Sequence, residues 1–165
     1  MRVAPNLKVV VISGGTASGK SALARALYNA LDEHWHLLQA DDFIGLAFKE
    51  LAGRGTWEPD GRRICRRMLN ESAKSWMERV KVALLVEGFF KEVREIDDLL
   101  AATGTSADQG SARILHLMVS EAEARRRRPY ESHRAAEAHP RAMTISTDEQ
   151  DLGRVLEWAK GALGP

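Results

Sequence analysis

The sequence predicts an α/β fold, a five-stranded parallel sheet with helices on both faces. Three observations lead to this fold class. Five short apolar runs alternate with segments in which apolar residues recur at helical spacing. A glycine-rich segment follows the first run directly and opens the first helix. The chain has 165 residues, 44% of them hydrophobic, which is enough for one domain with its own core.

The five apolar runs are short and rich in β-branched side chains, as is typical of strands buried on both faces. They cover residues 8–12, 35–40, 82–86, 113–119 and 143–146, and the last is the weakest. Parallel neighbours need crossover connections, so the intervening helices are expected to cover the faces of the sheet. The loops after the strands then meet at one edge, where ligands bind in such folds.

The helices are predicted from apolar side chains that recur every three or four residues. This pattern covers residues 21–31, 62–80 and 91–101. Two more helices are expected to begin at capping boxes: one at Ser120–Glu123, running to Pro129, and the last one at Thr147–Gln150. Residues 43–61 carry four glycines and Pro59 and are predicted to form a loop or a short helix.

The glycine-rich segment fits the phosphate-binding pattern G-x-x-x-x-G-K-[ST] at every fixed position. It consists of Gly14, Gly15, Thr16, Ala17, Ser18, Gly19, Lys20 and Ser21. Such a loop turns backbone N–H groups toward a phosphate at the start of a helix. Lys20 is expected to reach the β- and γ-phosphates, and the Ser21 hydroxyl to hold Mg²⁺. The chain is therefore predicted to bind a nucleoside triphosphate, with ATP as phosphoryl donor.

Carboxylates follow two of the predicted strands. Asp41 and Asp42 come after the second run, and Glu87 comes after the third. A carboxylate facing the γ-phosphate accepts the proton of a substrate hydroxyl, so this pattern favours a small-molecule kinase over a switch GTPase or a motor ATPase. The alternatives are a turn or helix cap for the aspartates and a surface strand end for Glu87.

Four consecutive arginines, residues 125–128, end the predicted helix that begins at Ser120. Arg125 and Arg128 share one face of that helix. A polar, proline-bounded segment follows, so residues 121–141 are interpreted as a lid that closes over the transferring phosphates. The alternatives are a solvated helix end favoured by the helix dipole and a nucleic-acid patch. The latter is disfavoured because no aromatic residue is interleaved with the run.

Composition narrows the functional classes. The net charge of +1 gives no electrostatic case for nucleic acid or an anionic membrane, and the longest apolar runs, such as 82–86, are too short to span a bilayer. Cys65 is the only cysteine, which excludes an internal disulfide framework. With no signal-like stretch at the N-terminus, we expect a cytoplasmic enzyme whose partners are ATP and a small-molecule acceptor. The sequence leaves the oligomeric state open.

Taken together, these segments resemble the nicotinamide riboside kinases, within the wider uridine kinase-like group. The matching segments follow the order of that family: Ile12–Ser21, Leu38–Phe43, Thr56–Asp60, Leu84–Phe89 and Glu123–Arg128. The Gln-x-Asp-Asp-Phe and Val-Glu-Gly-Phe pieces are the most restrictive. The resemblance implies a single P-loop kinase domain over residues 1–165 with a three-layer nucleoside kinase fold. It also implies a substrate-binding segment over 43–80 and a small arginine-bearing lid over 121–141.

The resemblance further implies roles for individual residues. Asp42 would be the base that takes the proton of a ribose 5′-hydroxyl, and Glu87 would help to hold Mg²⁺. Trp57 would stack on a pyridinium ring while Glu58 binds the ribose hydroxyls, as suits an indole face and a carboxylate. The alternative for Trp57 is a loop side chain packed into the core.

Arg125 and Arg128 would be the lid arginines that approach phosphate and substrate. The function implied is transfer of the γ-phosphoryl group of Mg-ATP to a nucleoside 5′-hydroxyl, converting nicotinamide riboside to nicotinamide mononucleotide in NAD biosynthesis. The alternatives are a kinase of another hydroxylated metabolite, such as uridine, cytidine or gluconate, and a non-catalytic nucleotide-binding regulator.

Overall fold

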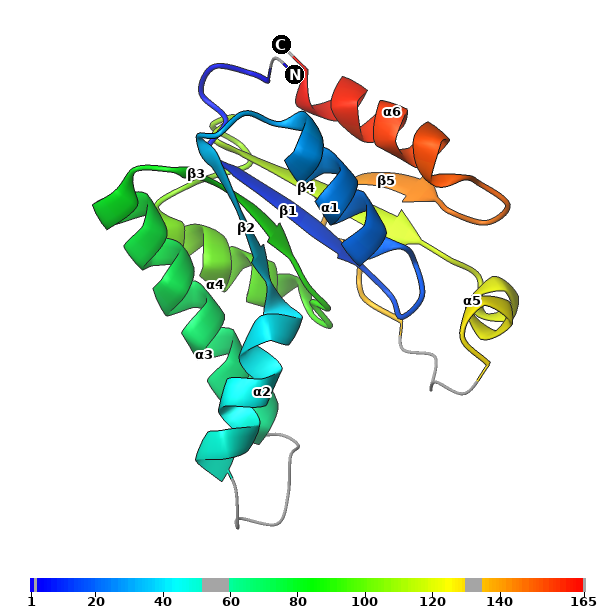
Figure 1. The fold of residues 1–165 in the computed structure, drawn as a ribbon, viewed down its shortest axis with the longest axis horizontal. Coiled ribbons are helices and arrows are strands. Elements are labelled where there is room, and N and C mark those ends of the chain that lie inside the picture. The colour runs from blue at the N-terminus through cyan, green and yellow to red at the C-terminus, as the bar shows by residue number, and fades with distance from the viewer. Residues whose placement is uncertain (2, 52–59, 130–134, 165) are drawn as a thin grey trace.

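A five-stranded parallel sheet, ordered β2-β3-β1-β4-β5, forms the centre of the structure (Figure 1). The computed structural model describes residues 1, 3–51, 60–129 and 135–164. The strands are β1 Val9–Gly14, β2 Trp35–Gln39, β3 Ala83–Glu87, β4 Ala112–Met118 and β5 Met143–Ser146. The sheet expected from the five apolar runs is confirmed, with strand ends shifted by no more than two residues.

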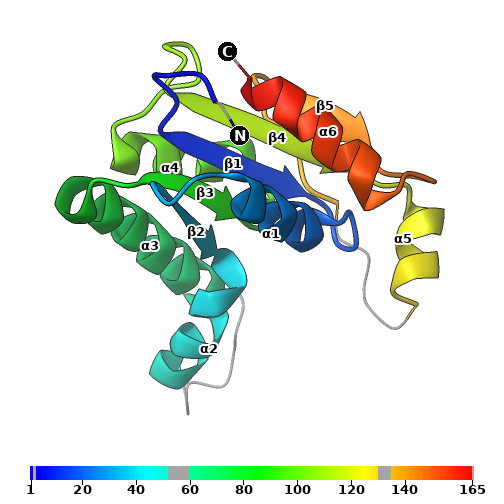
Figure 2. The same cartoon turned by 45° about the horizontal axis from the view of Figure 1, so that its top comes forward.

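Helices cover both faces of this sheet (Figures 1 and 2). They are α1 Lys20–Ala30, α2 Ala40–Leu51, α3 Asp60–Ser75, α4 Val93–Thr103, α5 Glu121–Arg127 and α6 Leu152–Leu163. One face carries α1 and α6, the other carries α3 and α4, and α5 lies beyond the carboxyl end of β4. Of the helices described, none combines the length and the hydropathy that crossing a lipid bilayer requires.

The central strand β1 is fully buried and contributes side chains to two cores. Val9 and Val11 pack with the residues of α3 and α4, whereas Val10 and Ile12 pack with those of α1 and α6. This alternation follows from the period of two along a strand. Because β1 is held on both faces and paired on both edges, the loop that follows it starts from a fixed point.

Helix α2 differs from the expectation of a loop or short helix over residues 43–61. It begins at Ala40, directly after β2, and extends past the carboxyl edge of the sheet (Figure 1). Asp41 and Asp42 occupy its first turn, where carboxylates interact favourably with the helix dipole. The two aspartates therefore lie inside the first helical turn, neither in a turn nor at a helix cap, and they remain at the edge of the sheet where ligands bind.

The helix predicted over residues 62–80 consists of α3 followed by a π-helical turn, Trp76–Val80. In this turn the ring of Trp76 stacks on His36 of β2, with ring centroids 3.8 Å apart. Lys81 then adopts a left-handed conformation with φ 65°, and its N–H bonds to the Trp76 carbonyl at 3.1 Å. The chain thus leaves the helix and enters β3.

The predicted start of the last helix at Thr147–Gln150 is wrong. Helix α6 begins at Leu152, where the Asp151 side chain caps it by accepting from the Arg154 N–H at 2.9 Å. Thr147 is buried instead, and both its N–H and its hydroxyl bond to the Met118 carbonyl at the end of β4. The sequence has the pattern of a capping box, but its first residue, Thr147, bonds to Met118 of β4 and does not cap the helix.

Candidate active site

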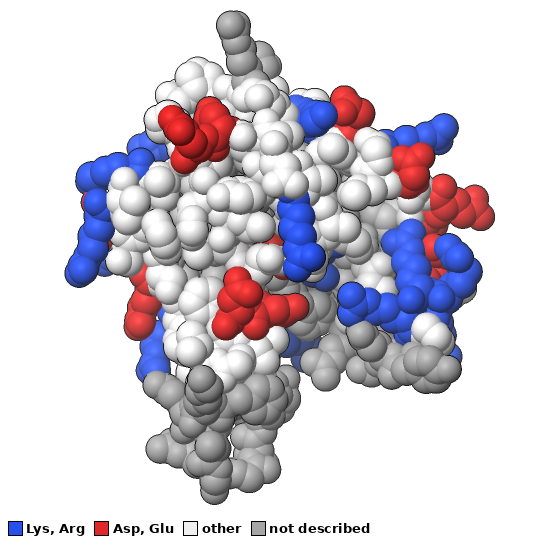
Figure 3. Space-filling view, viewed as in Figure 1, with Lys and Arg blue, Asp and Glu red and all other residues white. Residues whose placement is uncertain are grey.

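The phosphate-binding loop opens into a cavity of about 610 Å³ at the carboxyl edge of the sheet. Its lining includes Lys20, Ser21, Glu87 and Arg128, all predicted from the sequence. It also includes Asp41, the other member of the predicted carboxylate pair, together with Ile44, Phe89 and Arg127, which were not among the predicted site residues. Figure 3 shows basic side chains gathered around α5 and acidic side chains at the start of α2, on either side of this loop. The cavity thus joins cationic and acidic groups from segments far apart in the sequence.

Two glycines give the loop a path that other residues would block or strain. Gly14 has φ 146°, and a Cβ atom there would lie 2.4 Å from the Leu117 carbonyl oxygen of β4. Gly19 has φ 91° and is the last residue before α1. The backbone therefore turns tightly against β4 and delivers the N-terminus of α1 to the cavity, the arrangement that binds anions.

Lys20 stands at the start of α1 and reaches back over the loop. Its Nζ donates to the Gly15 carbonyl at 2.8 Å. Burial lowers the pKa of the Lys20 ammonium, the charges of Glu87 and Asp41 raise it, and Arg128 lowers it further, with a net lowering. An arriving phosphate would add the negative charge that keeps this ammonium protonated.

Ser21 and Glu87 meet beside Lys20. The Ser21 hydroxyl donates to Glu87 Oε1 at 3.3 Å, and Gln39 Nε2 donates to Oε2 at 3.2 Å. Burial raises the pKa of Glu87, against the opposing effects of Gln39, Lys20 and Ser21. Glu87, at the end of β3, is only 3% exposed, so it is not the surface strand end considered as an alternative.

The Ser21–Glu87 pair fits a Mg²⁺ ion, because a hydroxyl and a carboxylate are the oxygen ligands that this ion prefers. Among the described residues, no group of three or more His, Cys, Asp and Glu side chains could hold a metal. That donor set suits Mg²⁺ bound through one or two side chains, with substrate phosphates and water completing its coordination.

The two neighbouring aspartates are not equivalent. Asp41 lines the cavity, and its charge acts on both Lys20 and Glu87. Both side chains are exposed, but Asp42, which the resemblance made the base, lies outside the cavity lining. Both are in the first turn of α2, and successive residues of a helix point about 100° apart, so only one of them faces the phosphate loop.

The arginines of α5 likewise separate into different environments. Arg128 lines the cavity, as expected. Arg125 lies outside the cavity lining, is 70% exposed and pairs with Glu121 one helical turn away. The reason is that α5 ends at Arg127, so the backbone of Arg128 is no longer helical and the two side chains do not share a face.

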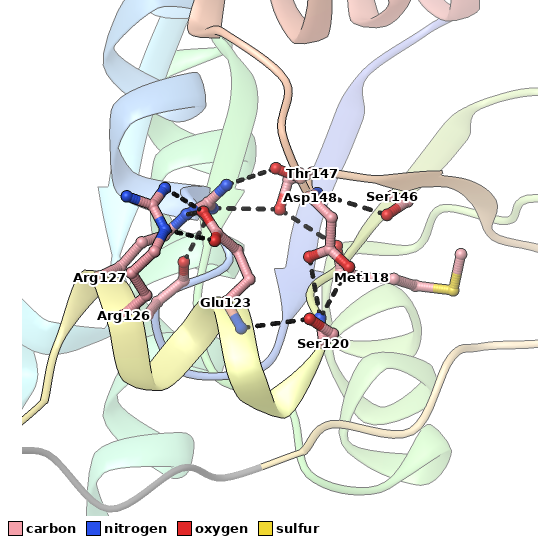
Figure 4. Close-up of polar contacts among 9 residues, drawn as sticks. Met118, Ser120, Glu123, Arg126, Arg127, Ser146, Thr147 and Asp148 are labelled. Atoms are coloured by element: carbon pink, nitrogen blue, oxygen red, sulfur yellow. Dashed lines mark hydrogen bonds and ion pairs between the residues drawn. The ribbon is translucent and has the colours of Figure 1, made fainter.

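Arg127, to which no individual role was predicted, lies at the centre of a polar network (Figure 4). Its guanidinium donates to Glu123, to the Ala17 carbonyl of the phosphate loop and to Thr147. Glu123 also accepts two bonds from Arg126, and these arginines lower the pKa of Glu123 to about 2. The i,i+4 spacing of Glu123 and Arg127 was the one signal in the sequence that could have indicated this pairing.

A second cavity of about 430 Å³ lies on the other side of Arg127. Leu117, Ala22 and Val155 give it apolar surface, and Arg126 and Gln150 give it polar groups. Arg127 lines both cavities, so the two adjoin at the phosphate loop. Trp57 and Glu58, the predicted nucleoside contacts, lie outside the described residues.

Comparisons with known proteins agree with this geometry. Residues 7–94 match the family described as chloramphenicol phosphotransferase-like protein, slightly more than half of the chain. No curated protein matches the chain in sequence. The matching family is not that of the nicotinamide riboside kinases, so the resemblance holds at the level of P-loop kinases.

Solved structures of kinases share the fold. A sugar kinase from Janibacter sp. HTCC2649 is 20% identical with a TM-score of 0.65, and 95% of this chain covers 94% of that one. An APS kinase from Mycobacterium tuberculosis, in complex with AMPPNP and APS, is 15% identical with a TM-score of 0.68, covering 97% and 99% of the two chains. A gluconokinase from Sinorhizobium meliloti 1021 is 16% identical with a TM-score of 0.65, covering 96% and 91%.

These structures confirm the fold class, a parallel sheet with helices on both faces as in P-loop kinases. The family match agrees with the prediction of a phosphotransferase that acts on an alcohol. It covers the phosphate loop, both aspartates and Glu87, the residues from which that prediction was made. The chain belongs to the chloramphenicol phosphotransferase-like family of P-loop kinases.

Proposed function

We propose that this protein is an ATP-dependent kinase that phosphorylates a hydroxyl group of a small molecule. The observation that carries the proposal is the convergence of Lys20, the Ser21–Glu87 pair and Asp41 on one cavity at the phosphate loop. These groups supply a cation, a metal site and a carboxylate base, which are the parts that phosphoryl transfer needs. The domain then comprises residues 1–165, with acceptor contacts within 43–80 and a lid over 121–141.

The donor nucleotide lies across the phosphate loop. Its β- and γ-phosphates occupy the cavity beside Lys20 and Arg128, where two cations and the loop N–H groups bind them. Its nucleoside lies in the second cavity, whose apolar surface suits a base and whose polar groups suit its edges. The position of Arg127 between the two cavities supports this division.

Transfer proceeds in line. Asp41 accepts the proton of the acceptor hydroxyl, the oxygen forms a bond to the γ-phosphorus, and the bond to the β–γ bridging oxygen breaks to leave ADP. Lys20 and Arg128 stabilise the charge on the transferring group. Ser21 and Glu87 would hold Mg²⁺, which when bound neutralises charge on the donor phosphates. Asp41 takes the role that the resemblance gave to Asp42.

The cavity wall next to Asp41, where the acceptor would bind, is apolar. Ile44 and Phe89 line it together with Asp41. An aromatic face and a branched aliphatic side chain favour an acceptor with a flat or apolar part next to its hydroxyl, more than an open-chain polyol. This favours a ring-bearing acceptor, and both chloramphenicol, from the family description, and nicotinamide riboside have a ring.

Nicotinamide riboside stays among the candidates because Trp57 and Glu58 match a nucleoside-binding pair in the sequence. Gluconate, sugars and APS enter through structural neighbours of low sequence identity. Because Ile44 and Phe89 make the cavity wall apolar, ring-bearing alcohols are the first acceptors to test.

A coupled ADP-release assay with Mg-ATP tests the proposal. The acceptors are chloramphenicol, nicotinamide riboside, uridine, gluconate, APS and none, and mass spectrometry of the product confirms the added phosphoryl group. Release that depends on one acceptor supports the kinase and names its substrate class. Tight ATP binding with no acceptor-dependent release over a wide library of alcohols would instead support a nucleotide-binding regulator.

A further inference from the structure

Arg127 connects three segments that are far apart in the sequence (Figure 4). Its Nη1 donates to the Ala17 carbonyl at 3.2 Å and to Thr147 Oγ1 at 3.3 Å, and its Nη2 donates to the Thr147 carbonyl. Its Nε donates to Glu123 Oε1 at 2.7 Å. We infer that Arg127 is a positioning residue that holds the phosphate loop in its binding conformation through the Ala17 carbonyl. This inference rests on the proposed nucleotide site.

The guanidinium of Arg127 is committed to the protein. The four bonds above use four of the five N–H groups that an arginine has. Arg128 differs, since it lines the cavity and its charge acts on Lys20. The two adjacent arginines therefore have different roles: Arg128 faces the phosphates, and Arg127 holds the loop that surrounds them.

The contact is made at a loop residue with an unusual backbone conformation. Ala17 has φ 61°, a left-handed conformation that a residue with a Cβ atom adopts at a cost. In a trans peptide bond, the usual form, the carbonyl and the following N–H point in opposite directions, so an Ala17 carbonyl directed at Arg127 sends the N–H of Ser18 the other way. That N–H lies 3.4 Å from the Gly15 carbonyl, inside the loop. Arg127 therefore stabilises the left-handed conformation of Ala17, in which the Ser18 N–H is directed into the loop.

The other end of the contact is rigid. Thr147 is 3% exposed, and its N–H and hydroxyl both bond to the Met118 carbonyl, at 2.8 and 3.1 Å. Asp148 fixes the start of α5 in turn, by accepting from the Ser120 N–H at 2.9 Å. Arg127 is thus bonded to Thr147, which is fixed to the end of β4, and to Glu123 of α5. Its bond to the Ala17 carbonyl therefore ties the phosphate loop to these two fixed elements.

Nucleotide affinity in a double-mutant cycle tests the inference. The proteins are the wild type, Arg127→Gln, Ala17→Gly and the double variant, each titrated with ADP and with ATP by calorimetry. We expect Arg127→Gln to weaken both nucleotides equally, by about tenfold, because the left-handed Ala17 is no longer held. In the double variant glycine adopts φ 61° without strain, so most of the affinity returns.

Two further variants separate geometry from charge. Arg127→Lys keeps the charge but not the planar fork, and is expected to weaken binding as much as Arg127→Gln. Arg67→Gln removes an exposed i,i+4 pair with Glu71 on α3, the same spacing as Arg127 and Glu123, and is expected to leave affinity unchanged. Amide hydrogen exchange of residues 15–19, measured without nucleotide, is expected to quicken in Arg127→Gln.

A loss confined to ATP would overturn the inference, because it would place Arg127 on the γ-phosphate. The absence of recovery in the double variant, or unchanged exchange of the loop amides, would overturn it as well. None of these measurements uses an acceptor, so they stand whether or not a kinase substrate is found. Should the wild type bind no nucleotide, the proposed function fails, while hydrogen exchange still decides the role of Arg127.

Discussion

The hydroxyl of Ser21 and the carboxylate of Glu87 lie 3.3 Å apart, although 66 positions separate them in the sequence. Ser21 is set by the first turn of α1 and Glu87 by the last residue of β3, and both elements pack on the central strand β1. The pair is therefore a product of the sheet order, which brings the ends of β1 and β3 side by side.

Glu87→Gln is predicted to abolish activity and to stabilise the protein. Glutamine keeps the shape and can bond to Ser21 and Gln39, but it is a much weaker metal ligand, so Mg²⁺-dependent turnover should fall by at least about 100-fold. Burial raises the pKa of Glu87, so the ionised carboxylate opposes folding as the pH rises through that raised pKa. The variant should therefore unfold at a higher temperature than the wild type at pH 8.

Thermal unfolding at pH 4 and pH 8 checks the stability part of this prediction. The gain should shrink toward pH 4, where Glu87 of the wild type is protonated and resembles glutamine. A variant less stable than the wild type at pH 8 would show that the charged form of Glu87 stabilises the fold.

Asp41→Asn and Asp42→Asn form a matched pair that tests which carboxylate is the base. Asp41→Asn should lower kcat by about 10²- to 10⁴-fold with nucleotide affinity nearly unchanged, the range for a lost general base. Asp42→Asn should stay within about twofold, because Asp42 does not line the cavity. The reverse order of effects would restore Asp42 as the base.

The difference between Asp41 and Asp42 also shows where prediction from the sequence stops. The strand runs and the glycine loop determine which segments reach the edge of the sheet, because their spacing is local and strong. Which of two neighbouring side chains faces the cavity depends on the rotation of α2, and that is determined by its packing against α3. The same limit explains why Thr147, a plausible helix cap, was taken instead by the Met118 carbonyl.

The arginine run shows this limit in another form. Its position after β4 was enough to predict a cationic segment at the cavity, and Arg128 lies there. The prediction that Arg125 and Arg128 share a face required the helix to continue through Arg128, whereas α5 ends at Arg127. Helix ends depend on tertiary contacts such as Arg127 to Thr147, which a single sequence does not reveal.

Arg128→Ala is accordingly predicted to matter more than Arg125→Ala. Loss of Arg128 should lower kcat/KM for ATP by about tenfold or more, because a cation near the transferring phosphates is removed. Loss of Arg125 removes only an exposed pair with Glu121, worth less than about 1 kcal/mol. Steady-state kinetics of both variants at constant ionic strength decides, and equal effects would favour a lid that acts through its overall charge.

Lys20 is predicted to make nucleotide binding sensitive to alkaline pH. Burial lowers the pKa of its ammonium, so the free protein loses this charge at a lower pH than an ordinary lysine would allow. Affinity for ADP should therefore fall as the pH rises from 7 to 10, and the fall should disappear in Lys20→Met, which binds weakly throughout. An identical pH dependence in Lys20→Met would assign the titration to another group.

Glu95 is predicted to be the main electrostatic support behind the cavity. It accepts three bonds from Arg62 and pairs with Arg66 at 3.3 Å, and its own side chain is 14% exposed. Arg66 in turn donates to the Phe89 carbonyl at 2.8 Å, next to the Phe89 side chain that lines the cavity. Glu95→Gln should cost about 3 kcal/mol of unfolding free energy, since it leaves a buried arginine without its counter-charge.

The pH dependence of Glu95→Gln separates this support from ordinary packing. Burial alone would raise the pKa of Glu95, but Arg66 and Arg62 outweigh it and lower that pKa below its usual value. The stabilisation is therefore present at neutral pH and is lost as the pH falls through the lowered pKa, so the deficit of the variant should narrow in acid. Denaturant unfolding at pH 7 and pH 3 measures it, and Glu71→Gln, which removes the exposed pair with Arg67, should change stability by less than about 0.5 kcal/mol. A deficit that is the same at both pH values would assign the loss to packing, and the charge of Glu95 would then have no part in holding Arg66 against Phe89.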